Sequence, residues 1–247
     1  MRKHFVKVSN YKRFRAGITA VENRGAAEAG WMLITGEAGH GKSATVDNWA
    51  AETGAVYLRA KVEWTPSYFF HELAQRLGID PPRFPKDLFS RLLATVGQQQ
   101  IPIVIDEVEH ALRDNAAVLE GLRDLTDLTE TPAILIGMEQ AQTKISRHLQ
   151  ISSRIAQVVT FQPATPDDVR LTCTELSEVA IADDLCAEIH RQSAGRMREL
   201  LNAIATVERT ALRNGQKQVA LADMVGQVLT HDWQARRPRA VKLTGGR

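Results

Sequence analysis

The stretch that most constrains the fold is a glycine-rich loop between an apolar strand and a helix. WMLIT at 31–35 is followed by GEAGHGKS at 36–43 and then by the helical pattern ATVDNWAAETG. The eight loop residues satisfy G-x-x-x-x-G-K-[ST], and a strand before and a helix after are the context in which this pattern binds phosphate. Glycines let successive backbone N–H groups face phosphate oxygens, and the helix N-terminus adds positive potential. The chain is therefore expected to bind a nucleoside triphosphate, ATP.

Individual loop residues have expected tasks. Lys42 is expected to reach the β- and γ-phosphates, and Ser43 to ligate Mg²⁺. His40, and His110 further along the chain, are interpreted as packing or solvent-facing side chains without a catalytic role. The residues of this region expected to contact the nucleotide are Gly36, Glu37, Ala38, Gly39, His40, Gly41, Lys42, Ser43 and Ala44.

A second apolar run, IVIDE at 103–107, ends in two adjacent carboxylates. Asp106 is expected at the carboxyl end of a strand, where it would hold Mg²⁺ and contact the nucleotide beside the loop. Glu107 is then placed to orient and deprotonate the attacking water. Uncompensated charges at the end of a buried strand are costly, so a structural reason for this pair is hard to find. The pair predicts ATP hydrolysis, with Glu107 and Lys42 as catalytic residues.

Short apolar runs alternate with helical patterns through about residue 160. Continuous apolar or β-branched runs are typical of parallel strands covered on both faces, so we expect an α/β fold with a parallel sheet sandwiched by helices. The expected strands are 31–35, 55–60, 101–105, 133–137 and 156–161, and the clearest helical stripes are 67–77, 86–96 and 115–128. After 162 no further strand is expected. Thr165 can cap a helix that has Pro166 at its first position, and the pattern stays helical to about 230.

Charge is distributed unevenly along the chain. Residues 1–21 hold six Lys/Arg and no acid, and 233–247 hold five and no acid, which leaves 22–232 with a net charge of −9. Such asymmetry is expected when chain ends touch nucleic acid or an acidic partner. We therefore expect a basic segment at 1–25, a nucleotide-binding α/β domain at 26–162, a small all-helical domain at 163–232 and a basic flexible tail at 233–247. Arg236, Arg237 and Arg239 of the tail are candidates for contacts with DNA or a protein partner.

With these motifs the sequence resembles the AAA+ ATPases of the P-loop NTPases over nearly its whole length. HLQISSRIAQVVTF at 148–161 is similar to the segment that carries an arginine reaching into a neighbouring subunit's ATP site. The resemblance implies Arg154 as the first choice for this catalytic arginine and Arg147 as the second. SAGRMRELLNAI at 193–204 is similar to the sensor 2 pattern of the helical lid domain, which implies Arg198 on the γ-phosphate.

Within AAA+, three stretches resemble the transposition ATPases, a group that includes the phage Mu B protein and the TniB/TnsC proteins, and most of all those of Mu-like phages. The stretches are LAQRLGI, LLATVGQQQIPIVIDEVEHAL and LRDLTDLTETPAILIGMEQ. The resemblance implies an ATP-dependent regulator of DNA transposition. Such a protein assembles as a filament or ring on duplex DNA, selects the target and recruits the transposase. No apolar run is long enough to span a bilayer and no secretory signal is present, so a cytoplasmic protein is expected, in the bacterial host if phage-encoded.

One departure from the family concerns the sensor strand, ILIGMEQ. Many AAA+ proteins place Asn or Thr at its end to help position the water, whereas this chain offers Gly137, Met138 and Glu139. The role is either unfilled or passes to Glu139 or Gln140. We therefore expect slow, Mg²⁺-dependent hydrolysis that DNA or a partner stimulates.

Contacts to duplex DNA are expected to be made to phosphates and to be sequence-tolerant. Lys61, after the second expected strand, and Arg113, after DEVEHAL, are the best candidates. Three alternatives stay open at this point. They are an ExeA-like ATPase that does not act on nucleic acid, an initiator or helicase-loader ATPase, and a nucleotide-binding signalling module without turnover.

Overall fold

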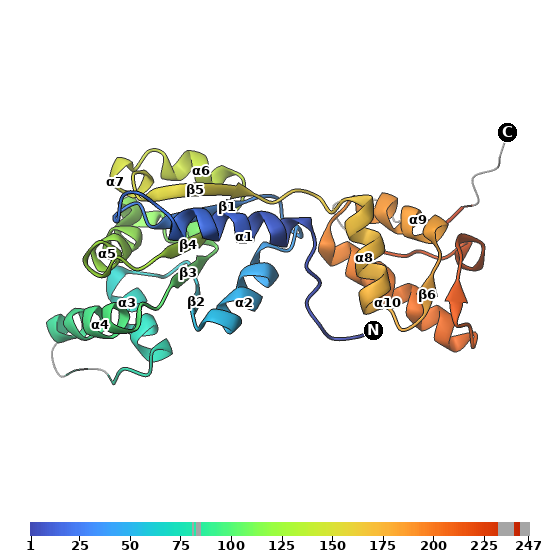
Figure 1. Cartoon of the computed structure of the whole chain (residues 1–247), viewed down its shortest axis with the longest axis horizontal. Coiled ribbons are helices and arrows are strands. Elements are labelled where there is room, and N and C mark those ends of the chain that lie inside the picture. Colours follow the sequence, from blue (N-terminus) through green and yellow to red (C-terminus); the bar gives the residue numbers. More distant parts are fainter. Residues whose placement is uncertain (81, 83–84, 232–239, 243–247) are drawn as a thin grey trace. The chain divides into compact units, whose positions relative to one another are not determined.

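The computed structural model describes residues 1–80, 82, 85–231 and 240–242, and the chain forms two compact units (Figure 1). We call the first the sheet unit; it comprises Arg13–Glu37 and Lys42–Phe161. The second, the helical unit, comprises Met1–Lys12, Ala38–Gly41 and Gln162–Arg247. The glycine-rich loop therefore contributes residues to both units.

The sheet unit is built on five parallel strands in the order β2-β3-β4-β1-β5. Each expected run overlaps one strand, with bounds that differ by at most two residues, and the α/β fold with a parallel sheet is confirmed. The strands are β1 (Trp31–Thr35), β2 (Val56–Arg59), β3 (Ile103–Asp106), β4 (Ala133–Ile136) and β5 (Ile155–Thr160).

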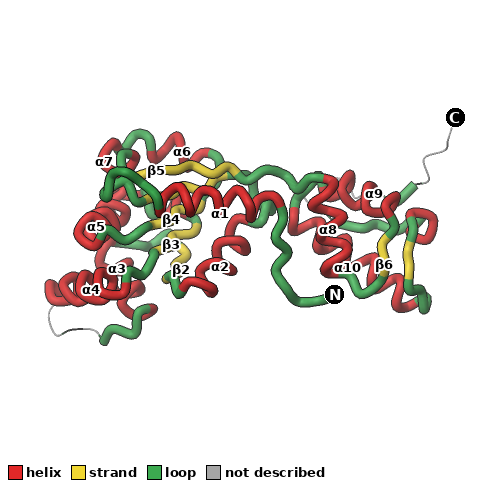
Figure 2. Tube along the Cα trace, viewed as in Figure 1, coloured by secondary structure: helices red, strands yellow, loops and turns green. Residues whose placement is uncertain are grey.

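Both faces of this sheet are covered by helices, as Figure 2 shows. Successive side chains of a strand point to opposite faces, so the apolar strands feed two separate cores. On one face Ile34 and Val104 pack with helices α1 (Ser9–Glu22) and α2 (Lys42–Thr53). On the other, Leu33 and Ile105 pack with a second set of helices. That set is α3 (Pro66–Arg76), α4 (Pro85–Gln99), α5 (Arg113–Thr129), α6 (Gln140–Ile145) and α7 (Leu149–Ser152).

Helix α1 occupies most of what the sequence presents as a basic segment. Phe14, Ile18 and Val21 are buried on its inner side, with the spacing of one helical face. Gly17 lets the helix approach the sheet closely, because a Cβ there would lie 2.6 Å from Val159 Cγ2 and 2.7 Å from Met32 Sδ. The basic residues of this stretch thus belong to a helix, α1, that has one face buried in the core.

The helical unit contains α8 (Pro166–Leu176), α9 (Asp183–Ser193) and α10 (Met197–Arg213). The expected cap is present: Thr165 Oγ1 accepts a hydrogen bond from the Asp168 N–H at 3.2 Å, and Asp168 Oδ2 accepts one from the Thr165 N–H at 3.0 Å. The expectation that no strand follows residue 162 was wrong. β6 (Ala180–Ile181) pairs in parallel with β7 (Gln218–Val219), and two-residue strands are too short to show a period in the sequence.

Part of the expected tail belongs to the core of the helical unit. Val241 is buried, its N–H donates to Gln227 O at 2.8 Å, and its carbonyl accepts from the Gly226 N–H at 3.0 Å. The pairing occurs because Val241 finds an apolar cluster to fill. Arg236, Arg237 and Arg239 lie outside the described residues. Within the described part of the chain, no helix combines the length and the apolar character needed to cross a bilayer.

Candidate nucleotide-binding site

The glycine-rich loop leaves β1 and enters α2 in the geometry that the motif requires. Gly36 has φ of +141°, and a Cβ there would lie 2.7 Å from Phe161 O, so no other residue fits against β5 at this point. Gly41 has φ of +85°, in the region that L side chains rarely adopt, directly before the helix begins at Lys42. The loop therefore presents its backbone N–H groups at a helix N-terminus, as phosphate binding demands.

Lys42 is buried and is held by neutral groups of its own loop. Its Nζ donates to Gly36 O and, at 2.9 Å, to Glu37 O. Burial lowers the pKa of Lys42, and the carboxylates of Glu109 and Asp106 act through space in the opposite direction. A lysine bonded only to carbonyls can transfer its hydrogen bonds to phosphate oxygens without breaking an ion pair.

Asp106 ends β3 as a buried carboxylate with both oxygens hydrogen-bonded. Its Oδ1 accepts the Glu107 N–H at 2.9 Å, and its Oδ2 accepts the phenol hydroxyl of Tyr57 at 2.6 Å. Burial raises the pKa of Tyr57, and the hydrogen bond to Asp106 raises that pKa further. Tyr57 is therefore a hydrogen-bond partner of the β3 aspartate that the sequence analysis missed.

Glu107 follows with its backbone in the left-handed region, at φ 56° and ψ 45°. A non-glycine residue rarely adopts this conformation, and such strain clusters at functional sites. Its side chain is 51% exposed, with Arg59 Nε 3.7 Å from Oε1 and His110 Nε2 3.8 Å from Oε2. Arg59 Nη2 also lies 3.6 Å from Asp106 Oδ2, because β2 pairs Arg59 with Asp106. Glu107 is therefore accessible to solvent and is held next to a cation.

The donor set of this edge fits a nucleotide-bound magnesium ion. The Ser43 hydroxyl and the Asp106 carboxylate supply oxygen ligands, which Mg²⁺ prefers. Among the described residues no cluster of three His, Cys, Asp or Glu side chains could hold a metal by itself. Magnesium in such sites keeps several waters and is shared with substrate phosphates, so one carboxylate and one hydroxyl suffice.

Near the end of β4 lies a carboxylate that the sequence analysis did not single out. Glu109, from the short helix at Val108–His110, accepts a hydrogen bond at Oε1 from the Met138 N–H. A Cβ at Gly137 would lie 2.9 Å from the same oxygen and 2.6 Å from Ala141 Cβ, which explains why no Asn or Thr occupies this position. Glu139 is exposed and interacts with Lys42 through space. Glu109 is held by its hydrogen bond at the end of β4. Glu139, which is exposed, stays a candidate for the sensor role of positioning the attacking water.

In the helical unit, the loop residues 38–41 meet the start of α10. The Arg198 N–H donates to Gly39 O at 3.4 Å, and the side chain of Arg196 lies 3.6 Å from the point where a Cβ on Gly39 would stand. The Arg198 side chain is exposed, and His40 is buried. Within the helical unit, the backbone of Arg198 therefore contacts loop residue Gly39, and its sensor role stays a prediction.

The two candidates for the intersubunit arginine differ in their partners. The Arg154 guanidinium binds Asp127 through Nε at 3.0 Å and Nη2 at 2.7 Å, and this carboxylate raises the pKa of Arg154. Arg147 is exposed at the end of α6. A neighbour's phosphate would have to displace Asp127 from Arg154, whereas the exposed Arg147 already faces solvent.

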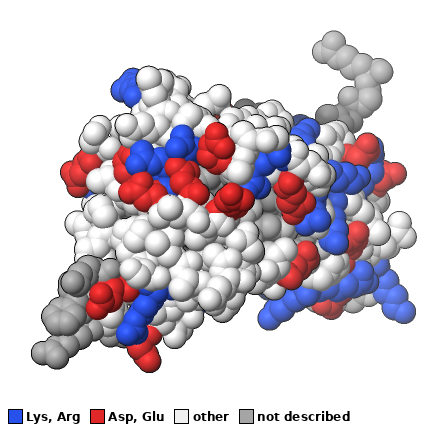
Figure 3. Space-filling model, turned by 60° about the vertical axis from the view of Figure 1, so that its left-hand side comes forward, with Lys and Arg blue, Asp and Glu red and all other residues white. Residues whose placement is uncertain are grey.

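A similar contrast separates the DNA-contact candidates. Lys61 Nζ lies 3.0 Å from both carboxylate oxygens of Glu72, so its charge is compensated within the chain. Arg113 is exposed at the start of α5 and donates to the Val62 carbonyl at 3.3 Å. On the face drawn in Figure 3, basic and acidic side chains lie side by side. Charge compensation therefore favours Arg113 over Lys61 as a phosphate contact.

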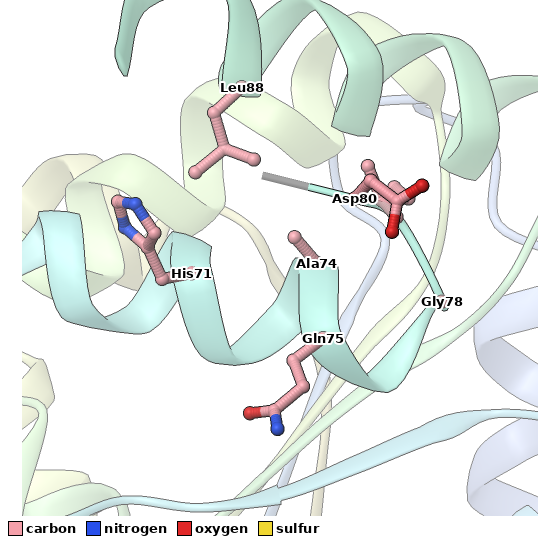
Figure 4. Close-up of a pocket in the computed structure, with 7 residues that line it drawn as sticks. His71, Ala74, Gln75, Gly78, Asp80 and Leu88 are labelled. Atoms are coloured by element: carbon pink, nitrogen blue, oxygen red, sulfur yellow. The ribbon is translucent and has the colours of Figure 1, made fainter. Parts of the chain in front are cut away.

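A cavity of about 450 Å³ lies elsewhere in the sheet unit, between α3 and α4 (Figure 4). None of its lining residues belongs to the predicted site, so the nucleotide site is identified by its loop chemistry and not by this cavity. The lining residues are His71, Ala74, Gln75, Gly78, Ile79, Asp80 and Leu88.

Comparison with known proteins agrees with this geometry. A family model described as an AAA domain matches residues 26–145. No curated protein matches the sequence. Among solved structures, Cdc6p from Pyrobaculum aerophilum is similar at 16% identity and a TM-score of 0.63, covering 87% of this chain and 64% of that one.

Two further solved structures share the fold. The Orc1 protein of Aeropyrum pernix in complex with DNA is 17% identical with a TM-score of 0.58, covering 88% of this chain and 63% of that one. The RuvB Holliday junction branch migration motor of Thermotoga maritima is 15% identical with a TM-score of 0.58, covering 85% and 64%. This chain thus spans less than two thirds of the length of these three proteins. At these identities the three structures show a shared fold.

Proposed function

Starting from an AAA-type P-loop ATPase domain at residues 26–145, we propose that the chain is an ATP-dependent DNA-binding regulator of DNA transposition. It assembles on duplex DNA, selects target DNA and recruits the transposase. The observation that carries the proposal is the through-space interaction of Lys42, at the end of the phosphate loop, with Asp106, which lies directly before Glu107 at the end of β3. The resemblance of three stretches to transposition ATPases supplies the biological context.

The chain's own residues divide the work of ATP hydrolysis. Lys42 exchanges its two carbonyl partners for the β- and γ-phosphates, and the loop N–H groups hold the remaining oxygens. Ser43 and Asp106 would hold Mg²⁺, which would neutralise phosphate charge when bound. Glu107 accepts the proton of the attacking water once Arg59 no longer holds its carboxylate. Without an Asn or Thr at the sensor position, unstimulated hydrolysis is slow.

Assembly on DNA completes each site with an arginine of the next subunit. Such an arginine stabilises the charge that develops in the transition state. Arg147 is favoured by its exposure, and Arg154 can act only if Asp127 is displaced. ATP thereby links neighbouring copies, and its hydrolysis releases them from DNA.

DNA is bound through phosphate contacts and therefore without strong sequence preference. Arg113 is the leading contact, because it forms no ion pair with the residues that the structure describes, whereas Lys61 is paired with Glu72. The printed descriptions of two neighbours, a DNA complex of Orc1 and a branch migration motor, support a nucleic-acid partner.

One alternative has a specific observation in its favour. The similarity to Cdc6p and Orc1 structures favours an initiator or helicase-loader ATPase that acts on DNA without a transposase. An ExeA-like ATPase and a signalling module that does not turn over predict no ATP-dependent DNA binding.

Filter binding to several unrelated duplexes, with and without ATP and across a salt series, tests the proposal. We expect ATP-dependent binding of similar strength to every duplex, with affinity falling steeply as salt rises. Absence of DNA binding with ATP would remove both DNA-linked functions. If binding occurs, the ATPase rate with DNA and a cognate transposase separates the two, because only a transposition regulator is stimulated by the transposase.

A further inference from the structure

The hydroxyl of Tyr57 contacts Asp106, one of the two residues expected to ligate magnesium. It donates to Asp106 Oδ2 at 2.6 Å. Tyr57 reaches this place because β2 pairs in register with β3, setting Tyr57 beside Val104 and Arg59 beside Asp106. Its ring packs against the core on the α1 and α2 face, which fixes the direction of the hydroxyl.

The same hydroxyl sets the orientation of Asp106. Oδ1 is held by the Glu107 N–H and Oδ2 by Tyr57, so the carboxylate plane is fixed at both oxygens. Arg59 Nη2 stands 3.6 Å from Oδ2, beyond a direct hydrogen bond. The hydrogen bond at Oδ2 thus comes from a neutral donor, and each carboxylate oxygen keeps a lone pair that can face a cation.

We propose that Tyr57 is a positioning residue for the metal, acting through Asp106, whose carboxylate it holds in place before the cation arrives. The inference concerns the nucleotide site alone, so it stands or falls independently of DNA and transposase. Outer-shell partners of this kind commonly change metal affinity by about 10- to 100-fold when they are removed.

The test is Mn²⁺ binding to the full chain saturated with a non-hydrolysable ATP analogue, followed by the electron paramagnetic resonance signal of free Mn²⁺. Tyr57→Phe removes only the hydroxyl, and Tyr68→Phe, at an exposed tyrosine, is the matched control. We expect Tyr57→Phe to weaken Mn²⁺ binding by about 10-fold and Tyr68→Phe to leave it unchanged. Nucleotide affinity in EDTA and the thermal unfolding midpoint should stay at the wild-type values.

Two results would overturn the proposal. Mn²⁺ affinity that is unchanged or tighter in Tyr57→Phe would show that the hydroxyl does not position Asp106 for metal binding. An equal loss of nucleotide affinity in EDTA would show that Tyr57 supports the loop as a whole. Should Tyr57→Phe fail to fold, Tyr57→Met, which also lacks the hydroxyl but has a flexible side chain, provides the same comparison.

Discussion

Lys42 and Lys61 are two lysines of the same unit whose charges are held in different ways. Lys42 donates to the carbonyls of Gly36 and Glu37, whereas Lys61 lies between the two oxygens of the Glu72 carboxylate. Neutral partners can be exchanged for phosphate at little electrostatic cost, but a carboxylate must be left uncompensated when its cation moves away. The difference teaches that a basic residue becomes a phosphate ligand only where the fold leaves its charge available.

The largest effect is expected at Lys42 itself. Lys42→Ala removes the loop side chain that is expected to reach the β- and γ-phosphates, so ATP binding and every ATP-dependent activity should fall to background. Binding of a fluorescent ATP analogue measures this, with Lys144→Ala on the exposed side of α6 as the control. Retention of ATP affinity by Lys42→Ala would contradict the assignment of Lys42 as a phosphate ligand.

The next largest effect separates the two arginines. Arg147→Ala should lower the ATPase rate of the assembled protein by about 10³-fold, because a trans arginine stabilises transition-state charge. Arg154→Ala should mainly loosen the contact with Asp127, with a smaller loss of rate and a lower unfolding midpoint. The check is steady-state ATPase at saturating DNA, together with mixtures of each variant with Lys42→Ala.

The mixtures identify which arginine acts across the subunit interface. A variant that lacks this arginine but has an intact phosphate loop should regain activity when it is mixed with Lys42→Ala, which still has the arginine. Recovery with Arg154→Ala and not with Arg147→Ala would reverse our assignment and return it to the first choice of the sequence analysis.

Glu107→Gln is expected to slow hydrolysis by about 10²- to 10³-fold while ATP binding is kept, because an amide cannot accept the proton of the attacking water. The assembled state should then persist on DNA, which dissociation kinetics after dilution can measure. Glu63→Gln, at an exposed position outside the site, is the control. If Glu107→Gln leaves DNA as fast as the wild type, Glu107 is not the catalytic base.

The smallest effect is expected at the two candidates for DNA contact. Arg113→Ala should weaken DNA binding several-fold and reduce the slope of log affinity against log salt by about 1, as expected for one lost phosphate contact. Lys61→Ala should change neither, since Glu72 already compensates its charge. Equal effects at the two positions would show that local ion pairs do not decide which cations reach DNA.

The strands and the phosphate loop could be predicted because their signals are local. WMLIT, the glycines at 36 and 41, and the two acids after IVI each depend on a few consecutive residues. The helix α1 was overlooked because its charges drew attention away from the buried face of Phe14, Ile18 and Val21. A search for helical spacing in that segment would have found it.

The partners of the site residues could not be predicted, because tertiary pairing creates them. Tyr57 and Arg59 reach Asp106 only through the register of β2 against β3, a pairing between segments nearly fifty residues apart in sequence. Asp127 lies 27 residues from Arg154, and nothing in either local pattern indicates their contact. Sequence motifs identify which residues carry chemistry, and the fold decides which of their charges are free.

The central claim is that ATP held by the phosphate loop links copies of the chain on duplex DNA. Mass photometry of the full chain with a non-hydrolysable ATP analogue and a short duplex tests it most directly. The account predicts multimers that appear only when analogue and DNA are both present, and that vanish in Lys42→Ala. A single-copy species under saturating analogue, with no mass gained from the duplex, would contradict it.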